Sequence, residues 1–376
     1  MFIGVPRETA DGETRVAATP ETVRKLTNQG HRLRVQAGAG LRACIPDQAY
    51  ADVGAELTNE TGALSCDLVL KVRPPIEAEL LLMKSGGTLV GMLEPFDRAN
   101  LDRLAKAGLT SFALEAAPRT TRAQSMDVLS SQANVAGYKA VMVAAAAYQR
   151  FLPMLMTAAG TVKAARVVIL GVGVAGLQAI ATAKRLGAVI EASDVRPGVK
   201  EQVESLGAKF IDVPYETDEE REAAAGAGGY AKPMPASWLE RQKLAVGKSV
   251  AAADIVITTA LIPGRTAPTL VTEDMVRSMK PGSVVVDLAA GKGADGICGN
   301  CTLSESAGTV VRHGVTVIGD SNLAARAAAD SSALYARNVI DFLKLLLTQD
   351  GTLHVPADDD IVSACLMTHA GNLLRN

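Results

Sequence analysis

The stretch Arg166-Val-Val-Ile-Leu-Gly-Val-Gly-Val-Ala-Gly176 decides the fold of this chain. Its first five residues form a short, mostly apolar run that predicts a buried strand, and Ala175–Leu186 predicts the helix that follows. The glycine spacing between them is typical of a dinucleotide-binding turn. Gly171 makes the tight turn, Gly173 lets the backbone approach a pyrophosphate, and Gly176 lets the helix pack closely on the strand. The helix N-terminus then offers free N–H groups and a positive dipole end to the phosphates.

The next apolar run, Ala188–Ser193, predicts a second strand, and Asp194 stands at its end. An acid at this place accepts hydrogen bonds from the ribose 2′-hydroxyl and repels a 2′-phosphate. We therefore expect the cofactor to be NAD(H) rather than NADP(H). Arg196 is a group that a 2′-phosphate would attract, but the nearby carboxylate of Asp194 opposes that binding.

Composition sets the class of protein around this site. A chain of 376 residues is expected to form two domains. Its residues are 48% hydrophobic but only 3% aromatic, and 34 are glycine, which fits an α/β protein with buried Val, Ile and Ala in its strands. The net charge of −2 provides neither a basic patch for nucleic acid nor a polybasic membrane anchor.

No stretch predicts membrane insertion or a metal site. The longest apolar stretches, Val141–Tyr148 and Val339–Leu347, are shorter than the ~20 residues that a span needs. The N-terminus reads as a strand rather than a signal peptide, so we expect a cytoplasmic protein. The five cysteines are scattered, which argues against a disulfide framework. Cys298 and Cys301 have the spacing of half a metal site, but no second pair follows, and a cysteine pair in a loop is the simpler interpretation.

Apolar and amphipathic stretches alternate along the chain, which predicts an α/β fold with two doubly wound Rossmann-like domains. We expect the first domain to comprise residues 1–128 and 325–376. The NAD-binding domain, residues 129–324, would be inserted in it. Two long Ala-rich helices, Met126–Arg150 and Arg326–Leu347, would join the two domains.

A polar segment upstream of the glycines adds specificity: Arg119-Thr-Thr-Arg-Ala-Gln-Ser-Met-Asp-Val-Leu-Ser130. With it, the chain resembles the NAD(H)-binding subunit of proton-translocating NAD(P) transhydrogenase, a family related to alanine dehydrogenase. The other segments that carry the resemblance are Thr157–Val162, Leu177–Gly187, Lys200–Gly207, Gly228–Lys232, Thr258–Gly264 and Met279–Val284. The resemblance runs along essentially the whole chain.

The resemblance implies roles for single residues. Arg119, Gln124 and Asp127, with Ser130 behind them, match a loop that contacts the nicotinamide and its ribose, and the glutamine also reaches the second nucleotide on the partner subunit. Taken alone, Arg119 and Asp127 would indicate only a solvated ion pair, but the intact spacing of the segment favours the catalytic role. Further cofactor contacts are implied for Val174, Val195, Arg196, Gly229, Tyr230, Gln242 and Leu261.

Two stretches interrupt the strand–helix pattern and are predicted to be loops. Pro214–Pro235 is charged and then Gly/Ala-rich, and the resemblance implies that its Tyr230 closes over bound nucleotide. Gly291–Cys301 is Gly-rich and is predicted to lie at the surface, with six or so residues around Lys292–Cys298 that look additional against the family. For Gln242, an ordinary exposed helix position is nearly as good an interpretation.

Alanine dehydrogenase is the main alternative function. Arg15 and Lys71 match the positions that hold the substrate carboxylate in that family. Amine oxidation also needs groups that move protons, however. The histidine expected near Leu93–Pro95 is replaced by Glu94, and Gly291 stands where an acid is expected. Hydride transfer between two nicotinamides has no such requirement, because the protein only has to hold the rings together and exclude water.

The chain has one glycine fingerprint, so it is expected to be incomplete as an enzyme. The resemblance implies a homodimer that works with membrane subunits and with an NADP(H)-binding domain on a partner, at the cytoplasmic face of the membrane and without inserting into it. No nucleic-acid partner is expected. A third possibility is a non-enzymatic NAD sensor, which the intact segment around Gln124 disfavours.

Overall fold

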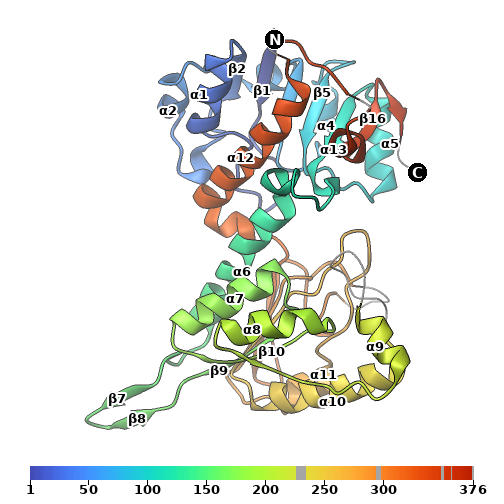
Figure 1. Cartoon of the computed structure of the whole chain (residues 1–376). Coiled ribbons are helices and arrows are strands. Elements are labelled where there is room, and N and C mark those ends of the chain that lie inside the picture. The colour runs from blue at the N-terminus through green and yellow to red at the C-terminus, as the bar shows by residue number, and fades with distance from the viewer. Residues whose placement is uncertain (226–233, 294–297, 349–350, 357, 375–376) are drawn as a thin grey trace. The chain divides into compact units, whose positions relative to one another are not determined.

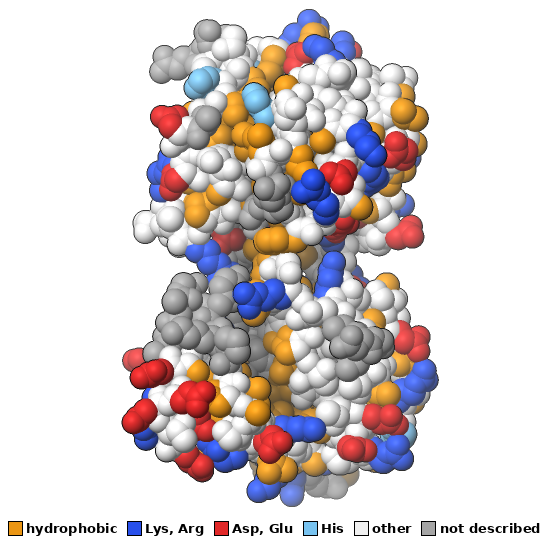
Figure 2. Space-filling model, turned by 90° about the vertical axis from the view of Figure 1, so that its right-hand side faces the viewer, with side chains coloured by type: hydrophobic (Ala, Val, Ile, Leu, Met, Phe, Trp, Pro, Cys, Tyr) orange, Lys and Arg blue, Asp and Glu red, His pale blue; other side chains and the backbone are white. Residues whose placement is uncertain are grey.

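The computed structural model describes residues 1–225, 234–293, 298–348, 351–356 and 358–374 (Figure 1). The chain divides into two compact units. Unit 1 comprises Met1–Gln132 and Ala324–Asn376, and unit 2 comprises Ala133–Leu323. Among the described residues, no helix combines the length and the apolar character needed to cross a membrane. On the face drawn in Figure 2, positive and negative side chains are interspersed.

Unit 1 is built on a mostly parallel sheet in the order β3-β2-β1-β4-β5-β6, and antiparallel β16 and β17 extend it beyond β6. The strand order reverses between β1 and β4, which is the switch point of a doubly wound sheet. The strands are β1 (Phe2–Val5), β2 (Arg32–Gln36), β3 (Glu56–Thr58), β4 (Leu68–Leu70), β5 (Thr88–Gly91), β6 (Thr110–Ala113), β16 (Leu366–His369) and β17 (Asn372–Leu373).

Helices of unit 1 pack into two cores that share this sheet. Val69 and Leu89 face a core with α3 and α5, whereas Leu68 and Val90 face a core with α1 and α12. The helices are α1 (Pro20–Asn28), α2 (Asp47–Ala51), α3 (Glu60–Leu64), α4 (Glu77–Leu80), α5 (Arg98–Lys106), α12 (Ala328–Leu346) and α13 (Asp360–Cys365), with short 3-10 turns η1 (Leu41–Ala43), η2 (Leu114–Ala116) and η3 (Gln124–Met126). Helix α6 (Val128–Ala147) and turn η5 (Leu323–Ala327) contain the passages of the chain between the units.

Unit 2 repeats the strand order, β11-β10-β9-β12-β13-β15, with antiparallel β14 at the edge. Its strands are β9 (Arg166–Leu170), β10 (Val189–Ser193), β11 (Lys209–Phe210), β12 (Ile255–Thr258), β13 (Val284–Asp287), β14 (Gly308–Arg312) and β15 (Val315–Gly319). Its helices are α7 (Val174–Arg185), α8 (Lys200–Ser205), α9 (Asp218–Ala225), α10 (Ala236–Ala252) and α11 (Glu273–Ser278), with turn η4 (Pro197–Val199). A separate hairpin, β7 (Leu155–Thr157) and β8 (Gly160–Val162), projects from the unit in Figure 1.

Strand β9 shows why unit 2 is doubly wound. Val167 and Ile169 point into a core with α7 and α8, while Val168 and Leu170 point into a core with α10 and α11. Because successive side chains of a strand alternate between faces, a run of apolar residues fills both cores. The predicted fold class, mixed α/β with parallel-dominated sheets in two units, is confirmed.

The two predicted loops of the second half are partly wrong. Pro214–Pro235 contains helix α9, which begins with three acidic residues in its first turn, a favourable place for negative charge. Gly291–Cys301 does not stay at the surface, because Asn300 and Cys301 at its end are fully buried. The prediction missed this because polar loop residues are usually exposed, and Asn300 is buried through hydrogen bonds that the sequence does not reveal.

Candidate functional site

The glycine turn lies between β9 and α7, as its spacing predicts. Gly171 has a left-handed φ of +94°, and a Cβ at Gly176 would lie 2.0 Å from the carbonyl oxygen of Gly171, so neither position tolerates a side chain. Gly173 is the first residue before α7, and a Cβ there would meet no atom of the described residues within 4 Å. No described side chain caps this helix end. Its N–H groups therefore form an anion-binding site of the kind that holds a pyrophosphate.

Asp194 follows β10 and is almost fully engaged by its neighbours. Its Oδ2 accepts the N–H of Val172 at 2.7 Å and Nη2 of Arg196 at 2.8 Å, and its Oδ1 accepts the N–H and Nε of Arg196, both at 2.9 Å. Burial acts to raise the pKa of Asp194, but the hydrogen bonds and charge of Arg196 outweigh it, so the pKa lies below its usual value. The carboxylate is therefore ionised, and its four acceptor positions are in use.

The other cofactor residues predicted for unit 2 lie at the same edge of the sheet where the structure describes them. Val174 and Leu261 are exposed, at 39% and 40%, in the turns that follow β9 and β12. Gln242 on α10 donates from Nε2 to the Oγ of Ser193 at 3.3 Å, so it is directed at the end of β10 and is not an ordinary surface position. Val195 packs against a small cluster around Trp238. Gly229 and Tyr230 lie outside the described residues.

The polar segment Arg119–Ser130 lies in unit 1, between β6 and α6. Arg119 and Gln124 are exposed, whereas Asp127 and Ser130 are half-buried. Asp127 accepts the backbone N–H of Ser130 at 2.8 Å and its hydroxyl at 2.6 Å. It therefore caps the start of α6, a role that the family resemblance did not imply.

Two contacts hold this segment on unit 1. Arg122 forms a two-bond pair with Asp359 at 2.7 and 2.9 Å and a further ion pair with Asp360 at the start of α13. Asn338 on α12 donates from Nδ2 to the carbonyl oxygen of Ser125 at 2.7 Å. Gln124 thus stands on a short turn whose neighbours on both sides are fastened.

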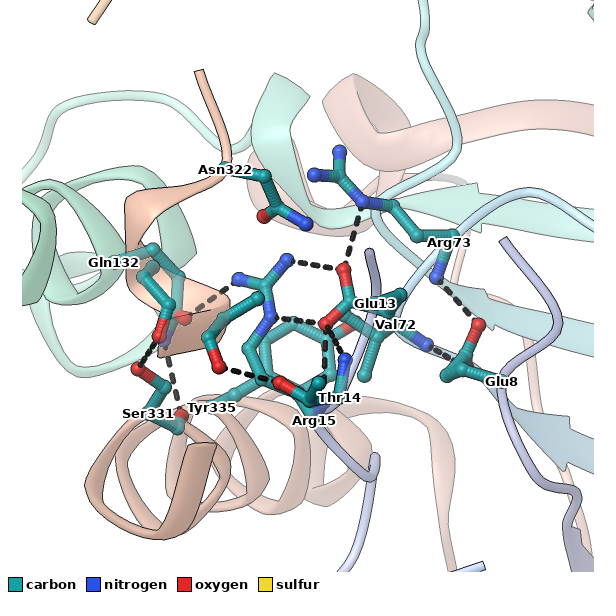
Figure 3. Close-up of polar contacts among 12 residues, drawn as sticks. Glu8, Glu13, Thr14, Arg15, Val72, Arg73, Gln132, Asn322, Ser331 and Tyr335 are labelled. Atoms are coloured by element: carbon teal, nitrogen blue, oxygen red, sulfur yellow. Dashed lines mark hydrogen bonds and ion pairs between the residues drawn. The ribbon is translucent and has the colours of Figure 1, made fainter. Parts of the chain in front are cut away.

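The corresponding edge of unit 1, after β1 and β4, is filled by buried ion pairs (Figure 3). Lys71 is fully buried, with its Nζ 2.8 Å from Oε1 of Glu79 and 3.4 Å from Oε2 of Glu8. Burial acts to lower the pKa of Lys71, but Glu8 and Glu79 outweigh it and hold the pKa above its usual value. Burial also raises the pKa of Glu8, an effect that Lys71 offsets in part.

Arg15 is paired in the same region. Its guanidinium donates to both carboxylate oxygens of Glu13, at 2.7 and 2.6 Å, and to Oε1 of Gln132 at 2.7 Å. Arg73 adds a contact to Glu13 at 3.0 Å. Burial acts to raise the pKa of Glu13, but Arg15 and Arg73 outweigh it and lower the pKa to about 2. Both candidate clamp residues, Arg15 and Lys71, are therefore bound to carboxylates of the chain itself.

Glu94 and Glu115 occupy the place where alanine dehydrogenase would carry its histidine. Glu94 has a left-handed φ of +53°, and its N–H donates to Oε1 of Glu115 at 2.7 Å, while Leu93 donates to Oε2 at 3.0 Å. Loss of water around the half-buried Glu115 raises its pKa to about 7, although these N–H groups act against the shift. Sequence reasoning missed Glu115, because nothing in its neighbours along the chain predicts where it lies.

Two doubly wound sheets, one of them with an open glycine turn and an acid at its switch point, define a dinucleotide-binding protein of the dehydrogenase type. Family models for the alanine dehydrogenase/PNT N-terminal and C-terminal domains match residues 4–136 and 140–376. The chain belongs to this family.

Its relatives include both activities for which the family is named. A chain of NAD(P) transhydrogenase subunit alpha from Rhodospirillum rubrum is 48% identical over 100% of this chain and 98% of its own length. The alanine dehydrogenase of Bacillus subtilis is 29% identical over 99% of this chain and 92% of its own length. A crystal structure of transhydrogenase from Sinorhizobium meliloti superposes with a TM-score of 0.89 at 46% identity and covers 100% of both chains. The chain is therefore more similar to these transhydrogenases than to this alanine dehydrogenase.

Proposed function

We propose that this chain is the NAD(H)-binding component of an NAD(P) transhydrogenase. It passes hydride directly between NAD(H) in unit 2 and NADP(H) on a partner subunit, and membrane subunits couple the transfer to proton translocation. The observation that carries the proposal is the contrast between the two switch points: the unit 2 edge offers open N–H groups and Asp194, whereas Arg15 and Lys71 in unit 1 are engaged by Glu13 and Glu79. The high identity to transhydrogenase alpha subunits supports it.

Alanine dehydrogenase remains the second candidate because the chain keeps Arg15 and Lys71 and is 29% identical to such an enzyme. The test is an assay of the purified chain with NAD and alanine, followed by addition of NADP(H)-binding and membrane subunits of a transhydrogenase. We expect no alanine-dependent NADH formation, and NADH-dependent reduction of an NADP analogue only after the subunits are added. Alanine-dependent NADH formation by the chain alone would move it to the second function.

The cofactor residues divide by role in this proposal. Gly171, Gly173, Val174 and Gly176 receive the pyrophosphate, and Asp194, Val195, Arg196 and Gln242 receive the adenosine half. Leu261, Gly229 and Tyr230 cover the nucleotide. Arg119, Gln124, Asp127 and Ser130 serve the nicotinamide half, with Gln124 as the residue that keeps the two nicotinamides in register.

Gln124 has no useful pKa, so its contribution to hydride transfer is positional. We expect Gln124→Asn to keep near-normal NADH affinity, because the pyrophosphate and adenosine contacts remain. Single-turnover transfer to an NADP analogue should slow by on the order of 10²-fold, since a misplacement of ~1 Å has that effect. Gln202→Asn, at an exposed position of α8, is the control. A Gln124→Asn protein that loses NADH affinity but transfers hydride at full speed would make Gln124 an ordinary binding residue.

The hairpin β7–β8 supports the proposal that the chain acts as a homodimer. Among the described strands, these two pair only with each other, and an isolated hairpin is at best marginally stable in water. Phe151, Met154 and Met156 expose 56%, 59% and 79% of their surface there. A second copy of the chain that covers them would stabilise the hairpin.

We expect Met156→Glu to shift the sedimentation of the chain from dimer to monomer. Leu244→Glu, which changes a 69% exposed residue of α10 in the same way, should leave the dimer intact. An unchanged dimer in Met156→Glu would remove the hairpin from the interface. We further propose that the dimer works at the cytoplasmic face of the membrane, held there by its partner subunits and without inserting itself.

A further inference from the structure

Asn300 joins two loops at the carboxyl ends of the strands of unit 2. It comes from the chain between β13 and β14, and it is fully buried. Its Nδ2 donates to the carbonyl oxygens of Ala260 at 2.9 Å and Pro268 at 2.7 Å, and its Oδ1 accepts the N–H of Ala260 at 3.1 Å. One side-chain amide thus holds both backbone groups of Ala260, in the turn that follows β12.

This turn in turn supports the glycine turn. The Oγ1 of Thr259, the residue before Ala260, donates to the carbonyl oxygen of Gly171 at 2.8 Å. A Cβ at Gly171 would lie 2.8 Å from that Oγ1 and 3.0 Å from the nitrogen of Ala260. The two turns fit so closely that a shift of Thr259 and Ala260 displaces the backbone of Gly171.

Asp287, at the end of β13, fixes the loop that delivers Asn300. Its buried carboxylate accepts from the Thr258 hydroxyl at 3.1 Å, the Ala289 N–H at 2.9 Å, the Cys301 N–H at 2.9 Å and the Ser304 hydroxyl at 2.7 Å. At Gly299, a Cβ would lie 2.5 Å from Oδ2 of Asp287, so the loop has no room to move inward. Asn300 is therefore held on a rigid support rather than on a surface loop.

The strand order shows which half of a dinucleotide this support serves. Asp194 follows β10, on one side of β9, and the turn of residues 259–261 follows β12, on the other side. A dinucleotide lies across the crevice at this switch point, with its adenosine ribose at the acid. The nicotinamide half therefore extends to the β12 side, where Leu261 is exposed.

We propose that Asn300 is a positioning residue that holds the turn of residues 259–261 in place for the nicotinamide half of the dinucleotide. It acts through Ala260 and Thr259 and does not touch the cofactor itself. The inference rests on the proposed NAD(H) site of unit 2. An amide is required at this place, because two carbonyl oxygens need donors and one N–H needs an acceptor.

The test replaces Asn300 with Asp, which has nearly the same shape but sets an oxygen against the two carbonyl oxygens. Calorimetry with NADH and with 5′-AMP, which contains only the adenosine half, separates positioning from a general structural role. We expect Asn300→Asp to bind NADH about tenfold to a hundredfold more weakly, because a buried pairing is lost, and to bind 5′-AMP within about twofold of the unchanged chain. Asn134→Asp, at an exposed position of α6 in unit 2, adds the same charge and should change neither affinity.

Equal affinity for NADH in Asn300→Asp and the unchanged chain overturns the inference but leaves the proposed function intact. An equal loss for NADH and 5′-AMP also overturns it, because Asn300 would then serve only the stability of the unit. If the Asp variant does not fold, Thr259→Val decides: a selective loss of NADH affinity supports the inference, and unchanged affinity contradicts it. Failure of the unchanged chain to bind NADH would instead contradict the proposed function.

Discussion

The two units of this chain share one strand order but treat their switch points in opposite ways. In unit 2, the turn after the first strand of the sheet is made of glycines, and the N–H groups of α7 remain open toward a ligand. In unit 1, the segment after β1 carries Glu8, Glu13 and Arg15, which pair with Lys71 and Arg73 from the segment after β4. The fold alone therefore does not make a binding site, because the side chains at the switch point decide whether it is open or filled.

The contrast also explains why unit 1 keeps cations that look like a substrate clamp. A buried ion pair is strongly destabilising to break, because the remaining charge is left without a partner. Arg15 and Lys71 can therefore be retained for the folding of unit 1 after a clamp function is lost. Both are available to the carboxylates of the chain, and both use them.

The largest effect is expected when this filled switch point is broken. Lys71→Met leaves Glu79 and Glu8 buried without their cation and should lower the free energy of unfolding by about 3–5 kcal/mol. NADH affinity of the folded protein should not change. Lys84→Met removes the cation of an exposed pair with Asp67 in the same unit and should have little effect on unfolding. A Lys71→Met protein as stable as the Lys84→Met protein would show that the cluster does not hold unit 1 together.

The next effect is a pH dependence that belongs to unit 1. The pKa of Glu115 is raised to about 7 in the folded chain, above its usual value, so the folded state binds more protons than the unfolded state between about pH 4.5 and 7. Its contribution to stability is therefore lost as the pH rises through this window, by up to roughly 3 kcal/mol.

Chemical denaturation at several pH values tests this, with Glu115→Gln compared against the unchanged chain. The difference in unfolding free energy between the two proteins should change across this window, in favour of the variant at the higher pH. Glu77→Gln, at an exposed carboxylate of α4, should give a difference that is constant with pH. A constant difference for Glu115→Gln as well would place the pKa of Glu115 at its usual value.

A smaller effect concerns the choice of cofactor in unit 2. Asp194→Ala should weaken NADH binding about tenfold to a hundredfold, because hydrogen bonds to a charged acceptor are lost. It also releases Arg196, which now pairs with Asp194, so affinity for NADPH should rise relative to NADH. Asp212→Ala removes a more exposed carboxylate paired with Lys200 and serves as the control. An unchanged preference for NADH in calorimetry would show that Asp194 does not select the cofactor.

The sequence was sufficient for the parts of this account that depend on local pattern. Strand Arg166–Leu170 and the helix after Gly173 follow from an apolar run, three glycines and the spacing to Asp194. The order of strands follows from the alternation of strands and helices. Short edge strands such as Glu56–Thr58 were missed, because three residues with two exposed side chains carry no clear period.

The partners of polar residues were not predictable in the same way. Asn300 binds Ala260 across 40 residues, and Glu115 binds Leu93 across 22, so neither contact leaves a local signal. Asp194 was predicted as a ribose acceptor, but its pairing with Arg196 was interpreted only as opposition between the two charges. Pairing depends on the third dimension, which spacing along the chain does not contain.

The most direct test of the central contrast is a calorimetric titration of Gly173→Ala with NADH. A Cβ at this position meets no described atom, so the variant should fold and melt like the unchanged chain. A methyl group there would hold the pyrophosphate away from the N–H groups of α7, and NADH affinity should fall on the order of tenfold to a hundredfold. The unchanged chain should bind one NADH. Retention of full NADH affinity in Gly173→Ala would contradict the account, because the dinucleotide would then bind somewhere other than the open switch point of unit 2.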